Sequence, residues 1–195
     1  MKQHMTVNVI EPDELKRIYE HIKKDFPKNE YPPYKILYKQ LKKGIQKGFV
    51  LLYDGNEVAY SICTQDKNSG FVLISLFAVY EEFRGKGIGS IFIEELKKIY
   101  SESSGIIVEV EKSETSQSIE EKAIREKRIA FYQRAGFNKI DNIDYSIWDV
   151  PMHLMVYSER FDKEYIKKHI DKIMYDIYLN LLGRLFIHKM KLKNF

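Results

Sequence analysis

The sequence predicts an α/β fold in which a mixed β-sheet carries helices on both faces. Segments with the apolar pattern of strands alternate with segments of helical spacing, in the order β-α-α-β-β-β-α-β-α-β-β, and a long helical tail follows. The length of 195 residues suits one domain with one appended element. A hydrophobic content of 44% with 31% charged residues excludes disordered, collagen-like and low-complexity chains.

The first half of the chain predicts one strand, two helices and then three strands. A short alternating strand at 6–10 precedes a helix that begins at 11–14, where proline and acidic residues suit the first turn. A breaker-rich loop at 26–33 separates this helix from a second one, which ends between Gly44 and Gly48. Three strands follow, at 49–53, 58–64 and 71–79. The last of them is almost continuously apolar, so we expect it to be a central strand buried on both faces.

The second half predicts three helices and three strands. A glycine-rich turn at 84–89 leads into a helix, and the next strand lies at 106–111. A helix at 120–135 ends before Gly136, where a C-terminal glycine belongs. The remaining predicted elements are strands at 138–145 and 152–157 and a helix at 163–185.

Composition narrows the class of protein. The formal charge of +4, from 32 Lys and Arg against 28 Asp and Glu, is too balanced to indicate nucleic-acid binding. Cys63 is the only cysteine, which excludes a disulfide framework or a cysteine-rich zinc site within one chain. The N-terminus lacks the apolar stretch of a signal peptide, and the longest apolar run, at 72–79, is too short to span a bilayer. We expect a cytoplasmic protein with no metal, no nucleic-acid partner and no membrane contact.

The most informative segment is the glycine-rich turn between 79 and 90, Val-Tyr-Glu-Glu-Phe-Arg-Gly-Lys-Gly-Ile-Gly-Ser. Glycines allow a ligand to approach the backbone closely, and the free amides and dipole at a helix start favour an anion such as a diphosphate. Arg84 and Lys86 add positive charge at its rim. The spacing matches neither the dinucleotide-binding motif nor the P-loop. The alternative interpretation is an ordinary glycine-rich turn without a ligand.

Two motifs in this sequence resemble the GNAT superfamily of acyl-CoA-dependent N-acetyltransferases. Arg84-x-x-Gly87-x-Gly89 after a hydrophobic strand is similar to motif A of that family. The segment 128–137, with Phe131-Tyr132 and Gly136-Phe137, is similar to the family's tyrosine-bearing helix. Segments 26–33 and 144–156 resemble a bacterial subgroup whose acceptors are undefined. The resemblance implies a GNAT-like mixed, mainly antiparallel sheet that is split at its two central parallel strands and flanked by helices, with a C-terminal helical extension.

The resemblance also implies how acetyl-CoA would bind. The cofactor would lie in a V-shaped opening between the strands at 71–79 and 106–111. Its pyrophosphate would sit on the amides of 85–90, and its pantetheine would pair with backbone groups around Phe77 and Val79. The expected cofactor-binding residues are Phe77, Ala78, Val79, Arg84, Gly85, Lys86, Gly87, Ile88, Gly89, Ser90 and Arg128.

Tyr132 matches the family tyrosine beside the thioester sulfur, so the resemblance implies that it protonates the leaving thiolate. A core ring beside Phe131 is the alternative. Some family members carry a glutamate base early in the central strand, but Leu73 stands at that position here. Glu109 and Glu111, which alternation places on one face of the neighbouring strand, are the candidate bases. Either one is otherwise an amine anchor or a solvated charge, and a water-relayed proton path stays open.

Arginines stand where family members often carry Asn and Ala. Arg125 and Arg128 are expected either to bind phosphate or acyl-carrier groups or, more simply, to pair with Glu121 and nearby acids. Glu30, Tyr31 and Tyr145 are the candidate substrate-binding residues, and the acidic residues Glu30, Glu109 and Glu111 favour a cationic small amine. The implied function is transfer of an acetyl group from acetyl-CoA to a primary amine. Two alternatives are a non-catalytic acyl-CoA sensor and an interaction protein with a vestigial cleft.

The helical tail has an apolar stripe that must be covered. Its members are Ile166, Ile170, Ile173, Ile177 and Leu181. The stripe packs either on this chain's own sheet or on a second chain in a homodimer, and both alternatives are open at this point. We therefore expect an acetyltransferase domain at 1–157 and a C-terminal extension at 158–195. The basic residues near the end, Lys189, Lys191 and Lys193, are expected to form a solvated tail.

Overall fold

The computed structural model describes residues 4–195. The N-terminal residues on which the signal-peptide expectation rests lie partly outside this range. The chain divides into two compact units. Unit 1 comprises Met1–Thr64 and Ile74–Ile99, and unit 2 comprises Gln65–Leu73 and Tyr100–Phe195. Each unit contains β-strands and α-helices. The predicted α/β fold, with a mainly antiparallel sheet flanked by helices and a C-terminal helix, is confirmed.

Unit 1 is built on strands that follow one another in sequence order. They are β1 (Met5–Ile10), β2 (Lys47–Tyr53), β3 (Asn56–Gln65) and β4 (Phe71–Val79), of which Gln65 at the end of β3 and the first three residues of β4 belong to unit 2. β1 pairs with β2 and β2 with β3, both antiparallel, and a β-bulge interrupts β2 between Leu51 and Leu52. The tight turn between β2 and β3 has Asp54 and Gly55 at positive φ, a conformation that the sequence Asp54-Gly55-Asn56 favours.

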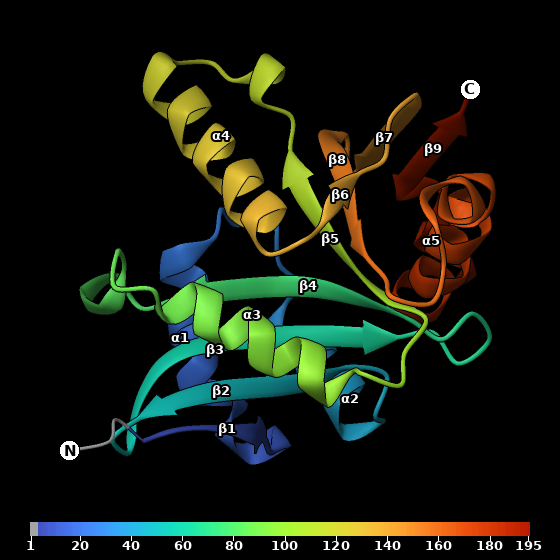
Figure 1. The fold of residues 1–195 in the computed structure, drawn as a ribbon. Coiled ribbons are helices and arrows are strands. Elements are labelled where there is room, and N and C mark those ends of the chain that lie inside the picture. The colour runs from blue at the N-terminus through green and yellow to red at the C-terminus, as the bar shows by residue number, and fades with distance from the viewer. Residues whose placement is uncertain (1–3) are drawn as a thin grey trace. The chain divides into compact units, whose positions relative to one another are not determined.

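Helices cover both faces of the unit 1 strands. α1 (Leu15–Asp25) and α2 (Tyr34–Lys42) pack their apolar stripes on a core that includes Tyr60, Leu76 and Ala78. α3 (Ile88–Ile99) lies on the opposite face, as Figure 1 shows, where Phe92 stacks on Phe77 with ring centroids 5.3 Å apart. Because side chains alternate along a strand, Phe77 points to α3 while its neighbours point to α1 and α2.

Unit 2 contains the remaining strands. These are β5 (Gly105–Glu111), β6 (Asn138–Lys139), β7 (Ile143–Ile147), β8 (Val150–Tyr157) and β9 (Met190–Asn194). Their order is β5-β8-β7-β9, and β6 also pairs with β8. The pairings of β5 with β8, of β8 with β7 and of β7 with β9 are antiparallel. Val108 lies opposite Met155, and Tyr145 lies opposite Leu192. α4 (Ile119–Arg134) lies on one side of these strands and α5 (Lys163–Phe186) on the other (Figure 1).

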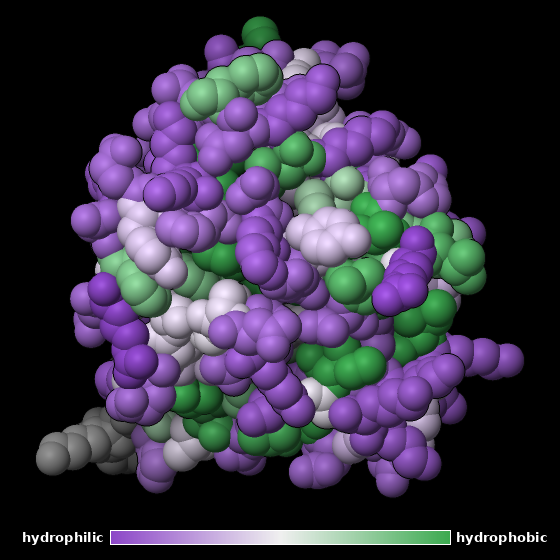
Figure 2. Space-filling model, turned by 90° about the vertical axis from the view of Figure 1, so that its right-hand side faces the viewer, coloured by the Kyte–Doolittle hydropathy of each residue, from purple (hydrophilic) through white to green (hydrophobic). Residues whose placement is uncertain are grey.

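The apolar stripe of α5 packs within unit 2. Ile166, Ile170, Ile173 and Ile177 are buried in one cluster with residues of β5, β7 and β8, and Leu181 is partly buried against that cluster. Asp162 caps the helix by accepting a hydrogen bond from the Tyr165 amide at 2.8 Å. Hydrophilic residues predominate on the face seen in Figure 2, with hydrophobic residues between them. The predicted boundary between residues 157 and 158 and the homodimer alternative stay predictions.

Two local predictions differ from the structure. The strand expected at 138–145 is divided into β6 and β7, because the chain turns at Asn142, which adopts a positive φ of 58°. The expected tail forms β9, because Met190 and Leu192 alternate with lysines and pack against the unit 2 core, while Lys191 and Lys193 are exposed as expected. Between residues 4 and 195, no helix has both the length and the apolar character needed to cross a membrane.

Candidate functional site

The candidate site residues fall into both units. The glycine loop, Phe77, Ala78, Val79, Glu30 and Tyr31 belong to unit 1, whereas Tyr132, Glu109, Glu111, Arg128 and Tyr145 belong to unit 2. Each group is built by neighbouring elements of its own unit.

The glycine loop of unit 1 exposes its backbone. Gly85 and Gly87 adopt φ values of 74° and 79°, a left-handed conformation that costs other residues roughly 1–2 kcal/mol. A Cβ atom at either glycine would meet nothing within 4 Å. Close packing against the described residues is therefore not the reason for glycine at these two positions. Lys86 between them is exposed. The glycines are therefore required by the path of the chain, and the space above them is open to a ligand.

The start of α3 supplies amides beside this loop. Ile91 donates to the Gly87 carbonyl at 3.2 Å, which begins the helical ladder, so the amides of Ile88, Gly89 and Ser90 precede it. Ile88 and Phe92 are buried and anchor the first turn on the unit 1 strands. A fixed helix start with open glycines before it has the geometry that suits a phosphate group.

Both cations of the loop have partners within unit 1. Arg84 donates from Nε to the Val79 carbonyl at 2.9 Å and forms an ion pair with Asp25 at 2.5 Å. Asp25 also accepts a hydrogen bond from the Tyr60 hydroxyl at 3.0 Å, and burial raises the pKa of Tyr60. Lys86 donates to the Glu82 carbonyl at 2.8 Å. Arg84 thus braces the end of β4, while about half of its side chain stays exposed.

The predicted substrate residues of unit 1 lie in a group of tyrosines. The Tyr31 ring meets the Tyr19 ring edge-on at 5.7 Å, and the Tyr34 ring does so at 5.3 Å. Tyr19 donates to the Pro32 carbonyl at 3.0 Å, which fixes the loop that follows α1. Glu30 lies in the same loop and is partly buried. These contacts give the loop a defined shape built from aromatic rings.

Tyr132 in unit 2 is buried on α4. Its ring meets Phe131 at 5.0 Å and Phe137 at 5.4 Å, both edge-on. The helix ends just beyond it, where the Phe137 amide donates to the Tyr132 carbonyl at 3.0 Å and Gly136 adopts a φ of 83°. The segment 128–137 therefore places the tyrosine in an aromatic cluster at the C-terminal end of the helix.

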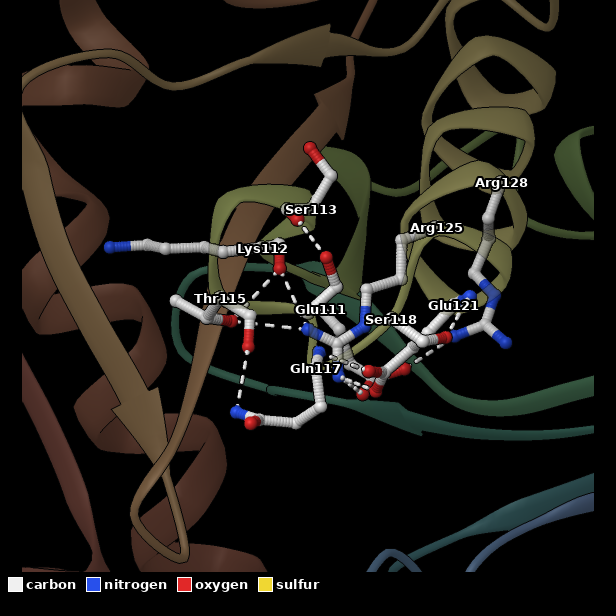
Figure 3. A network of polar contacts seen from close by, with 10 residues as sticks. Glu111, Lys112, Ser113, Thr115, Gln117, Ser118, Glu121, Arg125 and Arg128 are labelled. Atoms are coloured by element: carbon white, nitrogen blue, oxygen red, sulfur yellow. Dashed lines mark hydrogen bonds and ion pairs between the residues drawn. The ribbon is translucent and has the colours of Figure 1, made fainter.

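Glu111, at the end of β5, is held by two arginines of α4 (Figure 3). Arg125 binds one of its oxygens at 2.6 Å, and Arg128 binds the other at 3.1 Å. Arg125 is only 8% exposed and also contacts Glu121, the Lys112 carbonyl and the Thr115 hydroxyl. Its Nε is buried without a hydrogen-bond partner among the described residues. The simpler expectation for these arginines, pairing with Glu121 and a nearby acid, is confirmed.

Glu109, two residues earlier on β5, has an entirely different environment. Its Oε1 atom accepts a short hydrogen bond from the Tyr145 hydroxyl, and the Tyr178 hydroxyl lies 2.8 Å from both carboxylate oxygens. The residue keeps some exposed surface, but its carboxylate is enclosed. Burial raises the pKa of Glu109, and the two tyrosine donors partly offset this. Burial beside Glu109 also raises the pKa values of Tyr145 and Tyr178 well above 10.

Two residues of these sites were missed at the level of sequence. Asp25 is the partner of Arg84 across 59 positions, and Tyr178 is the partner of Glu109 across 69 positions. Tyr178 lies beside the apolar stripe of the tail helix and is buried with it, a position that gave no sign of its polar contact. Over the stretch from residue 4 to residue 195, no three His, Cys, Asp or Glu side chains are grouped to hold a metal ion.

A family comparison matches the central part of the chain. Residues 45–139 match the model of the acetyltransferase (GNAT) domain, a stretch that contains β4, the glycine loop, α3 and α4. This stretch is thus similar to a GNAT acetyltransferase domain, and the resemblance found in the two motifs is confirmed. No curated protein matches the chain significantly.

Solved structures extend the likeness beyond this domain. A protein from Bacteroides thetaiotaomicron that is assigned to the GNAT acetyltransferases has a TM-score of 0.74 and 21% identity, over 91% of this chain and 98% of its own. Arabidopsis thaliana NAA60 in complex with acetyl-CoA has a TM-score of 0.62 and 16% identity, over 81% and 100%. A chimera of Vibrio cholerae spermidine N-acetyltransferase SpeG and hSSAT has a TM-score of 0.60 and 14% identity, over 79% and 95%. These similarities establish the N-acetyltransferase fold.

Proposed function

We propose that this protein is an acetyl-CoA-dependent N-acetyltransferase, an acyltransferase that transfers an acetyl group directly to a primary amine of a small substrate. The observation that carries the proposal is the open glycine loop at the start of α3. Gly85 and Gly87 need their left-handed conformation and have free space around them, beside the amides of Ile88, Gly89 and Ser90. This arrangement suits the diphosphate of acetyl-CoA.

Acetyl transfer to an amine requires one proton donor and one proton acceptor. Tyr132 is the proposed donor to the departing thiolate, with a phenol whose ring is held by Phe131 and Phe137. Glu109 is the better candidate acceptor of the two predicted carboxylates, because its burial raises its pKa toward the range of a useful base. The carboxylate of Glu111 forms ion pairs with two arginines, so Glu111 is the weaker candidate for the proton acceptor.

The acceptor is proposed to be a small cationic amine. The predicted acceptor-side residues Glu30 and Tyr31 offer a carboxylate and an aromatic ring, which attract and cover a protonated amine, whereas Tyr145 is fully buried and donates its hydroxyl hydrogen bond to Glu109. One structural neighbour is a spermidine N-acetyltransferase, which supports polyamines as the first compounds to test. We further propose that the enzyme acts in the cytoplasm and that residues 1–157 form its acetyltransferase domain.

A thermal-shift measurement followed by thiol release tests this function. Acetyl-CoA should raise the melting temperature, because a ligand that binds only the folded state stabilises it by mass action, whereas NAD and ATP should not match the effect. CoA release is then measured across polyamines, amino acids, aminoglycosides and peptides with free N-termini. No thermal shift at millimolar acetyl-CoA contradicts the proposal.

Replacement of Tyr132 by Phe tests the proton donor. The ring stays in place, so acetyl-CoA affinity should change little, while turnover should fall by roughly 10²–10⁴-fold for a true general acid. Tyr157→Phe is the matched control, because the Tyr157 hydroxyl contacts Glu159 at the surface. Unchanged turnover in Tyr132→Phe would assign Tyr132 to the aromatic core alone.

A second candidate function is a non-catalytic acyl-CoA sensor. The observation that favours it is that the carboxylates of both Glu109 and Glu111 already have side-chain partners. A sensor would retain the thermal shift with acetyl-CoA but release no thiol with any amine. The two functions therefore differ in the second assay only.

A further inference from the structure

We propose that Tyr178, on the C-terminal helix α5, acts together with Tyr145 as a positioning residue for Glu109, holding its carboxylate as the proton acceptor of the reaction. The inference rests on the proposed acetyltransferase function, adds Tyr178 to it and gives Tyr145 a different role. It also gives α5 a part in the catalytic machinery, although this helix lies outside the stretch that matches the family domain.

The geometry around Glu109 leaves its carboxylate little freedom. Tyr145 comes from β7 and donates to Oε1, while the Tyr178 hydroxyl from α5 is 2.8 Å from both Oε1 and Oε2. The rings of Tyr145 and Tyr178 are themselves buried, 0% and 6% exposed, within the core of unit 2. Because both phenols are fixed by packing, the carboxylate is held from two directions in one orientation.

The same contacts set the acidity of the group. Within unit 2, the titratable side chains that face Glu109 are Tyr145 from β7 and Tyr178 from α5, and β8 places the apolar Leu154 opposite it. Burial disfavours the charged carboxylate, whereas each phenol hydrogen bond favours it. The tyrosines therefore oppose the effect of burial and keep Glu109 able to release its proton again after each turnover.

A buried carboxylate with two hydroxyl partners also occurs as a purely structural feature. The two roles differ in what the loss of one hydroxyl does. In a structural cluster, Tyr178→Phe lowers stability but leaves the pH dependence of the reaction unchanged. In a positioning role, Tyr178→Phe removes a donor to the charged form, so the pKa of Glu109 rises and the acid limb of kcat/KM moves with it.

The experiment compares wild type, Tyr178→Phe, Tyr145→Phe and the control Tyr175→Phe, whose exposed ring lies on the same helix. The acid limb of kcat/KM should move to higher pH by about one unit in Tyr178→Phe, in the same direction in Tyr145→Phe, and not at all in the control. Glu109→Gln should lose this limb altogether. Melting curves establish that each variant is folded at the assay temperature.

A carbon-13 NMR titration of the Glu109 carboxyl, identified by its absence in Glu109→Gln, gives an independent measurement of the pKa. An unchanged Glu109 pKa in Tyr178→Phe overturns the inference even if the enzyme is active. A shifted pKa with an unshifted kinetic limb also overturns it, because Glu109 is then not the proton acceptor. Absence of wild-type turnover with every amine defeats the proposed function itself, and with it the catalytic role of the cluster, whatever the titration gives.

Discussion

Replacing Arg125 by Met should destabilise the protein far more than replacing Arg128, although both arginines bind the same carboxylate. Arg125 is 8% exposed and has four acceptors, namely Glu111, Glu121, the Lys112 carbonyl and the Thr115 hydroxyl. Arg128 is exposed over 43% of its side chain, and its one ion pair with a residue between 4 and 195 is the pair with Glu111. Methionine keeps most of the length of either side chain and removes its charge and donors.

The expected loss follows from which acceptors remain buried. Without Arg125, the side chain of Glu111, which is 15% exposed, keeps only Arg128, and the Lys112 carbonyl loses its guanidinium partner. Removing one partner from such a buried network lowers the free energy of unfolding by about 3 kcal/mol. For a chain of this size, this corresponds to a fall in Tm of roughly 6–12 °C. The exposed pair of Arg128 contributes at most about 1 kcal/mol.

Urea unfolding at 25 °C, followed by circular dichroism, measures both free energies on the same scale, and acetyl-CoA titration of the folded variants adds the affinity. Equal losses in the two variants, or a loss below about 1 kcal/mol in Arg125→Met, would refute the structural reasoning. Arg128 was also predicted to bind the cofactor. If it does, Arg128→Met weakens acetyl-CoA binding while stability stays near that of wild type.

Three further results are expected. Ile170→Ala, in the fully buried face of α5, should lower the unfolding free energy by about 2–5 kcal/mol, whereas Leu185→Ala, at an 81% exposed position, should change it by less than about 0.5 kcal/mol in the same urea assay. Gly87→Ala should weaken acetyl-CoA binding at least about tenfold by calorimetry. Gly44→Ala, with a similar φ of 65° and equally open space, should carry the same backbone cost and leave binding intact. The stability that Glu109 contributes should be fully present below its ordinary pKa near 4.5 and be lost as pH rises through its raised pKa in the folded protein. Unfolding free energies measured across this pH range should therefore fall less for Glu109→Gln than for wild type, and parallel curves would contradict the raised pKa.

The order of elements was predictable because local signals define it. Asp54-Gly55-Asn56 favours a hairpin, and Gly136 after a helical segment favours a helix end, and both occur as expected. Turn residues and apolar alternation were less informative beyond Asn138. Asn142 carries the turn between β6 and β7 without a glycine, and the lysines of β9 masked a strand whose apolar residues pack inward.

The contacts of the candidate site also differ in whether the sequence reveals them. The ion pair between Arg125 and Glu121 joins residues four apart on one helix, a spacing that can be seen in the sequence. The contact between Tyr178 and Glu109 depends on how α5 packs on β5, and the pair of Arg84 and Asp25 depends on how α1 meets the end of β4. No local period encodes such long-range pairs, so only the folded chain shows them.

The packing of α5 also has a consequence for synthesis on the ribosome. The apolar cluster of unit 2 begins with Phe71 and Leu73 and is completed by α5, which is translated after the strands that it covers. At 5–20 residues per second, the chain between β8 and the end of α5 takes roughly 1–6 seconds to appear. During that interval β5, β7 and β8 lack the cover of this helix, and their apolar side chains are available to chaperones or to other nascent chains. The time needed to complete α5 therefore sets how long the newly made protein needs protection from aggregation.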